Sequence, residues 1–187
     1  LTLIFVSKPK HLEDPFAQVS PDELEALSRS QARMIKGTGY QAIQGSKPQT
    51  LGYGLTDSAV GLAAWISEKF QHWTDPNVPF EQSISMDELL TNILLYWVSG
   101  NITASTRLYY ESAHSNANFF EGGRILTPTG HAVFPGELYL PPRAWAEMLY
   151  NIQHWEIQPK GGHFAALEVP ELLATDLRTF FRPYRVS

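Results

Sequence analysis

The last third of the chain alternates between strand and helix patterns, and this order restricts the fold more than any other feature of the sequence. Residues 124–134 predict a strand, 141–149 a helix, 152–157 a second strand and 167–181 a final helix. Strands that alternate with helices are typical of a parallel α/β sheet. Two strands do not make a stable sheet alone, so we expect this segment to complete a sheet whose other strands come from elsewhere.

The chain up to about residue 115 shows helix and loop patterns instead. Ser20 and Ser85 are each followed three residues later by Glu, which is the capping-box pattern of a helix N-terminus. Asp57 and Ser58 open a further helix, and a fourth is predicted over 104–112. Glycines end two of these helices. We therefore expect a mainly helical region before the α/β segment.

The charge and composition exclude several classes of protein. The net charge is −5 and Lys and Arg do not cluster, which argues against a nucleic-acid partner. The chain has no cysteine, so disulfides, thiolate catalysis and Cys-bound metals are excluded. Residues 1–6 are apolar but too few to cross a bilayer, and no later window reaches 18 uninterrupted apolar residues. These first residues, without an initiator Met, indicate a piece of a longer polypeptide.

Two polar residues follow the predicted strands. Gly161 and Gly162 permit a tight turn after the second strand, and they leave His163 on a loop before a helix. Glu137 follows the first strand, at the carboxyl edge where open α/β sheets build their sites. A His that is oriented by a carboxylate suits proton transfer near neutral pH. A loop His without a role and a solvated loop Glu are the alternatives, and the local sequence alone does not decide between them.

Seven segments of the chain form a recognisable pattern together. They are GYQAIQ at 39–44, LTDSAVGLAAWISEKF at 55–70, LLTN at 89–92, YW at 96–97, RLYYE at 107–111, FPGEL at 134–138 and GGHFAALE at 161–168. In this order, from about residue 37 onward, the chain resembles the microsomal-type epoxide hydrolases, a group that includes the juvenile hormone epoxide hydrolases. Ala59 stands where the family usually has Pro.

The resemblance implies a role for each matching residue. His163 matches the base that activates water, and Glu137 matches its acidic partner. Tyr40 and Tyr109 match the two lid tyrosines that hold the epoxide oxygen and protonate it as the ring opens. Tyr110 is a neighbouring alternative, although on a helix it points about 100° away from Tyr109. The implied reactants are a small apolar epoxide and water, and no cofactor or metal is implied.

The family's nucleophile has no counterpart in these residues. It is an Asp in a Gly-x-Asp-x-Gly strand-to-helix elbow, and the 187 residues contain no such segment. The expected fold class is therefore the C-terminal part of an α/β-hydrolase fold, with a helical lid over 1–118 and the last strand-helix-strand-helix of the sheet over 119–187. An N-terminal half would supply the Asp. We expect these residues alone to be inactive and poorly folded, and a homodimer stays open.

Two other readings remain. Ester hydrolysis or haloalkane dehalogenation would use the same late His but would not need two lid tyrosines as proton donors. An inactive fragment or interaction module would need none of the four residues, and their joint presence weighs against it. The residue at the missing elbow distinguishes the enzymatic readings, because an esterase would have Ser there.

Overall fold

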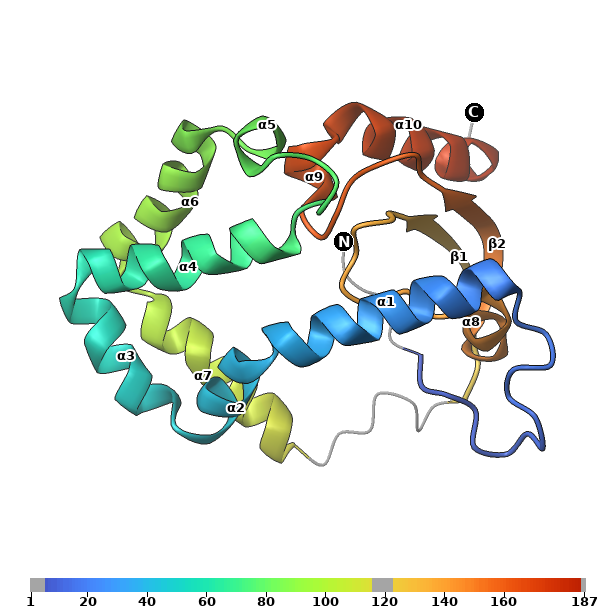
Figure 1. Cartoon of the computed structure of the whole chain (residues 1–187), viewed down its shortest axis with the longest axis horizontal. Helices are drawn as coiled ribbons and strands as arrows, with labels where there is room; N and C mark the ends of the chain where they lie inside the picture. Colours follow the sequence, from blue (N-terminus) through green and yellow to red (C-terminus); the bar gives the residue numbers. More distant parts are fainter. Residues whose placement is uncertain (1–5, 116–122, 186–187) are drawn as a thin grey trace.

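The computed structural model describes residues 6–115 and 123–185. Figure 1 shows helices α2 to α7 on one side of the molecule and the two strands with α8, α9 and α10 on the other, while α1 extends from the strands toward α2. The elements are α1 (Pro21–Gly37), α2 (Gly39–Ser46), α3 (Pro48–Asp57), α4 (Ala59–Trp73), α5 (Phe80–Ser83), α6 (Met86–Ser99), α7 (Ile102–His114), β1 (Ile125–Val133), α8 (Arg143–Leu149), β2 (Tyr150–Ile157), α9 (Ala165–Glu168), α10 (Pro170–Phe181) and the short 3₁₀ helix η1 (Arg182–Tyr184).

Three of the helix starts that the sequence predicts, those at Ser20, Ser58 and Ser85, are confirmed. Ser20 caps α1 and Ser85 caps α6, and each forms the complete reciprocal capping box with the Glu three residues later. The Ser58 side chain accepts a hydrogen bond from the amide of Gly61 at the start of α4. Gly100 ends α6 in the left-handed conformation with φ 64°, which glycine adopts without a steric penalty.

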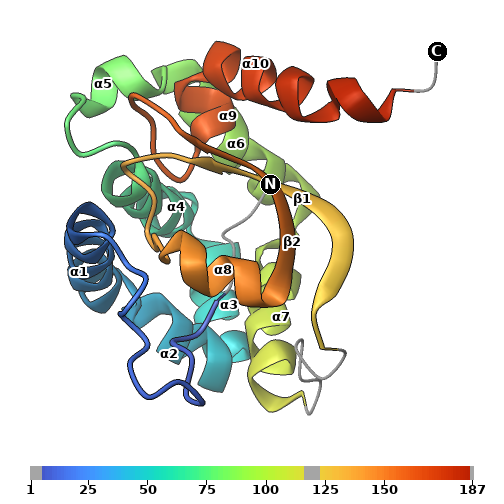
Figure 2. The same ribbon diagram turned by 90° about the vertical axis from the view of Figure 1, so that its right-hand side faces the viewer.

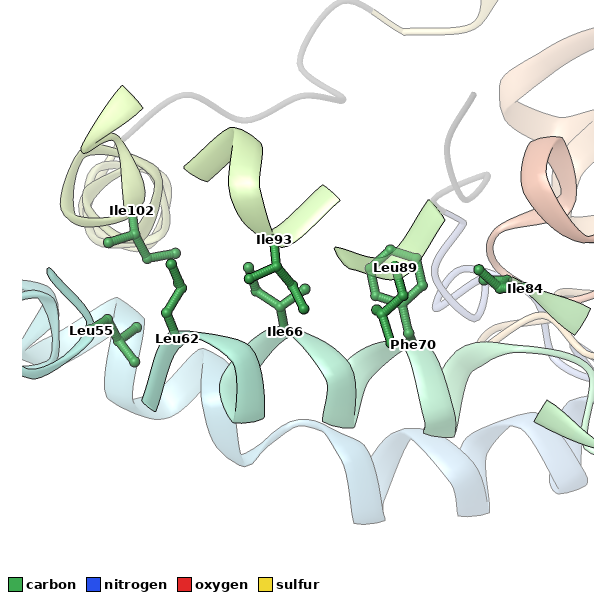
Figure 3. Packing of buried hydrophobic residues seen from close by; sticks show 8 residues of the cluster. All are labelled: Leu55, Leu62, Ile66, Phe70, Ile84, Leu89, Ile93 and Ile102. Atoms are coloured by element: carbon green, nitrogen blue, oxygen red, sulfur yellow. The ribbon is translucent and has the colours of Figure 1, made fainter. Parts of the chain in front are cut away.

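Helix α4 forms the centre of the largest apolar core. Its side chains Leu62, Ile66 and Phe70 are spaced at helical intervals and point toward α6 and α7 (Figure 3). Leu62 is completely buried, and a fully buried side chain of this kind stabilises the fold by roughly 1.5–3 kcal/mol. The rest of the cluster is contributed by Leu55, Ile84, Leu89, Ile93 and Ile102. This helical region therefore has an apolar core of its own.

The strand–helix–strand–helix order of the last third is confirmed. β1 and β2 pair in parallel, with α8 as the connection between them. Figure 2 shows α8 and α10 on opposite sides of the two strands. Apolar strand residues remain uncovered within this chain, since Leu126 is 76% exposed and Ile157 is 73% exposed. Such exposure is expected where further sheet strands or helices complete the layer.

Three parts of the helix prediction were wrong. Helices α2, α3 and α5 were not predicted, and α7 is longer than 104–112. The helix predicted over 167–181 is in fact two helices, α9 and α10. The reason is Pro170, which disfavours helical geometry at the preceding residue, and Val169 accordingly has φ −143°.

Some expectations fall outside the described residues. Residues 1–5 lie there, and so does the expected boundary between 118 and 119. The division into a lid and a core segment therefore stays a prediction. Among the residues that the structure describes, none of the helices combines the length and the apolar character that a bilayer span requires.

Candidate active site

His163 and Glu137 lie side by side in the loops that follow β2 and β1. The His163 Nδ1 atom is 2.8 Å from the Glu137 Oε1 atom, so the hydrogen bond expected from the sequence is confirmed. The same oxygen accepts from the amide of Leu138 at 2.6 Å, which fixes the carboxylate. Because an ionised carboxylate only accepts hydrogen bonds, the tautomer of a neutral imidazole that fits this contact carries its proton on Nδ1 and leaves the Nε2 lone pair available to accept a proton from water.

The two loops are held together through their glycines. The Gly136 amide donates to the Gly161 carbonyl at 2.9 Å, and Gly136 and Gly162 form a parallel bridge. Gly161 has φ +111°, a conformation that other residues rarely adopt. A Cβ on Gly162 would lie 2.6 Å from the Asp75 amide nitrogen and 2.7 Å from the Trp73 carbonyl. The segment after α4 therefore lies directly against the His163 loop.

Replacement of Gly162 by Ala is expected to lower the free energy of unfolding by about 3 kcal/mol, because its Cβ would meet backbone atoms that cannot move aside. Gly54→Ala is the matched control, since a Cβ there meets nothing within 4 Å and lies in helix α3. It is expected to raise stability by roughly 0.5–1 kcal/mol. Denaturant unfolding of the parent and both variants, each in the whole polypeptide that contains these residues, measures the difference, and equal stabilities would contradict the close approach of the two segments at Gly162.

A row of aromatic rings connects His163 to the two candidate proton donors. The Trp73 ring lies 5.2 Å from the His163 ring between centroids, Tyr40 lies 5.3 Å from Trp73, and Tyr109 lies 5.6 Å from Tyr40. Phe164 also contacts His163, at 5.2 Å. The structure thus brings all four residues that the sequence singled out into one continuous region.

Tyr40 and Tyr109 line the same hollow between helices α2, α4, α6 and α7. Burial raises the pKa of Tyr109 to about 12, with the nearby Tyr40 as a further cause, so the Tyr109 hydroxyl keeps its proton at neutral pH. Tyr110 is exposed and stacks on His114 at 4.0 Å. The expectation that only one of the two adjacent tyrosines faces this region is therefore confirmed, and it is Tyr109.

A second hollow contains His163 and Glu137 and adjoins the first. Both hollows are lined by Phe164 and Leu167, so these residues form the wall between the base and the tyrosines. His131 on β1 also lines the second hollow, and burial lowers its pKa to about 4. His131 is therefore neutral at pH 7.

Trp73 and Lys69 were not identified from the sequence. The Lys69 ammonium lies 4.6 Å from the centre of the Tyr40 ring and forms an ion pair with Glu68. Trp65, Lys69 and Trp73 follow one another at intervals of four residues, which places them on one face of α4. That four-residue spacing was the sequence feature that could have identified Lys69 and Trp73. In the described part of the chain no cluster of three or more metal-binding side chains occurs, so no residue is assigned to a metal.

The chain is similar in sequence to proteins that are named epoxide hydrolases. No family model matches the chain. A putative epoxide hydrolase of Stigmatella aurantiaca is 46% identical over 174 residues, which are 92% of this chain and 39% of that protein. Epoxide hydrolase 1 of Sus scrofa is 44% identical over 79% of this chain and 34% of its own length.

Solved structures give the same result. The epoxide hydrolase of Aspergillus niger superposes with a TM-score of 0.81 and 30% identity, over 97% of this chain and 45% of that one. The juvenile hormone epoxide hydrolase of the silkworm Bombyx mori superposes with a TM-score of 0.81 and 33% identity, over 89% of this chain and 42% of that one. The chain belongs to the epoxide hydrolase family.

The family sets the fold in context. These epoxide hydrolases have the α/β-hydrolase fold, and the helices with a small parallel sheet correspond to part of it, as the sequence predicted. The chain spans about two fifths of the length of the epoxide hydrolases that it matches. The exposed apolar residues on β1 and β2 accord with this partial coverage.

Proposed function

We propose that this chain supplies the water-activating base and the proton donors of an epoxide hydrolase that converts an apolar epoxide to a vicinal diol. His163 is the base, Glu137 orients it, and Tyr40 and Tyr109 bind and protonate the epoxide oxygen. The support is the 2.8 Å contact between His163 and Glu137, together with the row of rings that leads from His163 to both tyrosines. The nucleophilic Asp would come from a part of the protein outside these residues.

The reaction would proceed in two steps. In the first, the Asp carboxylate attacks an epoxide carbon, the ring C–O bond breaks, and a tyrosine hydroxyl gives its proton to the departing oxygen. In the second, His163 Nε2 takes a proton from water and the resulting hydroxide attacks the ester carbonyl. The bond between the ester oxygen and the Asp carbonyl carbon then breaks, and the departing alkoxide takes the proton of the newly formed Asp carboxyl group, which gives the diol and restores the carboxylate. The proton held by His163 returns to the ionised tyrosine, so both groups are ready for the next epoxide.

The two hydroxyls in one hollow favour epoxides over other substrates. An ester or a haloalkane substrate would not need two phenol donors, whereas an epoxide leaves as an alkoxide that is costly without a proton. The Tyr109 pKa of about 12 keeps that proton available at neutral pH. Inactivity of these 187 residues by themselves stays a prediction, since they contain no Gly-x-Asp-x-Gly segment.

The test uses the complete protein, meaning these residues joined to the rest of their polypeptide. With enzyme in excess over styrene oxide in ¹⁸O-labelled water, the first diol formed should carry no label, because its new oxygen comes from the Asp carboxylate. Label should then appear in the protein, and further additions of styrene oxide to the same enzyme should give labelled diol. Labelled diol in the first turnover would contradict the ester intermediate, and absence of any turnover of epoxides would contradict the function.

Substitution of Glu137 by Gln should lower kcat by about 100-fold or more, because an amide can present its NH₂ group to Nδ1 and so leave the proton on Nε2. The loss should fall on ester hydrolysis, since the tyrosines are unchanged. Glu81→Gln, at an exposed position on α5, is the control and should match the parent. Stopped-flow measurement of the two steps separates these effects. Equal rates for Glu137→Gln and the parent would remove Glu137 from the mechanism.

A further inference from the structure

The C-terminal end of α4 is joined to both loops of the candidate site. The His163 amide donates to the Trp73 carbonyl at 2.9 Å. Arg33, on α1, donates from Nη2 to the His72 carbonyl at 2.7 Å and to the Thr74 carbonyl at 3.2 Å. A cation at the last carbonyls of a helix is favourable, because these carbonyls lack partners within the helix.

Arg33 also reaches the loop that carries the acid. Its Nη1 donates to the Gly136 carbonyl at 2.5 Å, one residue before Glu137. Burial lowers the pKa of Arg33, while the carboxylates of Glu137, Asp75 and Glu168 act in the opposite direction. A planar guanidinium with several donors can serve two segments at once, which a lysine ammonium with one nitrogen cannot do in the same geometry.

Two carboxylates make the corresponding contacts to the His163 loop. Asp75 is 3% exposed and accepts from the Gly161 amide at 2.8 Å. Glu168 accepts from the Asp75 amide at 2.8 Å with one oxygen and from the Phe164 amide at 3.0 Å with the other. The two carboxylates together thus hold the backbone on both sides of His163, Asp75 through the Gly161 amide before it and Glu168 through the Phe164 amide after it.

We propose that Arg33, Asp75 and Glu168 are positioning residues that fix the end of α4 against the loops of Glu137 and His163. Trp73, the last residue of α4, contacts both the Tyr40 ring and the His163 ring. The network therefore sets the separation between the proton donors and the base. This inference rests on the proposed function, because both groups must reach one bound epoxide and its ester.

The consequence for catalysis is that the network supports both chemical steps. A displacement of about 1 Å of a reacting group can cost about 100-fold in rate. If the end of α4 moves, Tyr40 moves away from the epoxide oxygen, and His163 loses the backbone contact that holds its loop. Loss of the network should therefore slow ester formation and ester hydrolysis together, whereas a change at Glu137 affects hydrolysis alone.

The test compares Glu168→Gln and Arg33→Lys with matched controls in the complete protein. Glu168→Gln keeps the size of the side chain, but its NH₂ group must face one of the two backbone amides that donate to Glu168. Arg33→Lys keeps the positive charge but loses the two guanidinium NH₂ groups that donate to separate segments. The controls are Glu171→Gln, at an exposed position three residues beyond Glu168, and Arg29→Lys, one turn before Arg33 and exposed. Active sites are counted from the burst of covalent ester with styrene oxide.

Both network variants are expected to show kcat per active site lowered by about 10- to 100-fold in each step, with KM changed by less than about 3-fold. The controls should match the parent. A purely structural role would lower the melting temperature or the number of active sites but leave kcat per active site unchanged, and that result would overturn the proposal. Full activity of Arg33→Lys would overturn the geometric role of Arg33. A parent protein that does not turn over epoxides would overturn the proposed function itself and this proposal with it.

Discussion

Replacement of His163 by Gln is expected to stop the reaction at the covalent ester. Gln cannot take a proton from water at neutral pH, so the second step should slow by at least about 10³-fold, while attack on the epoxide continues. Mass spectrometry of the complete protein after mixing with styrene oxide should show one added substrate mass on every active molecule. Steady-state diol formation should fall to the background rate.

His11→Gln serves as the control for this experiment, because His11 is exposed in the loop before α1 and distant in sequence from both candidate loops. It should show parent turnover and no lasting adduct. Full hydrolysis by His163→Gln without an adduct would remove His163 from the mechanism. An adduct that hydrolyses at the parent rate would show that another group activates the water.

Removal of the phenol hydroxyls should slow ester formation and leave ester hydrolysis unchanged, which is the reverse of the result expected for His163→Gln. Tyr40→Phe and Tyr109→Phe each delete one donor to the epoxide oxygen and keep the ring, so ester formation should slow by about 10²–10³-fold for each. The double variant should form no ester on the time scale of the assay. Hydrolysis of an ester that has already formed does not need these donors and should change little.

Tyr110→Phe is a sensitive control, since Tyr110 is adjacent to Tyr109 in the chain but exposed. It should leave ester formation unchanged. Because burial raises the pKa of Tyr109 to about 12, the donating form should persist well above pH 9, and its ionisation should not limit ester formation there. Parent rates in both single Phe variants would contradict the assignment of the donors.

The features that could be predicted from the sequence have local causes. The capping boxes at Ser20 and Ser85 involve residues three positions apart, and they placed α1 and α6 correctly. The two strands follow from short β-compatible runs that turns and glycines delimit. The pairing of His163 with Glu137 was predictable because residues that follow neighbouring parallel strands emerge at one edge of the sheet.

The features that could not be predicted depend on distant partners. Arg33 and the Gly136 carbonyl are 103 residues apart, and Asp75 and Gly161 are 86 residues apart. In sequence, Arg33 reads as one of several cations on an amphipathic helix, and Asp75 reads as a residue after a helix end.

Helices α2 and α3 were missed because their glycines, at 39, 45, 52 and 54, obscure the helical pattern. At Gly52 a Cβ would lie within 3 Å of the Thr103 side chain, so close helix packing rather than helix propensity explains that glycine.

The contact between the Trp73 carbonyl and the His163 amide joins two backbones. A change of the side chain at position 73 does not by itself remove this contact, so one aromatic ring can replace another there while the His163 loop keeps its backbone contact and a ring still packs against Tyr40. Because the contact joins two backbones, the side chain at position 73 can change the shape of the hollow that contains Tyr40 and Tyr109 without changing the position of the His163 loop. Among variants with Phe, Tyr or His at position 73, altered substrate preference should therefore be more frequent than inactivity, because a ring still packs between Tyr40 and His163.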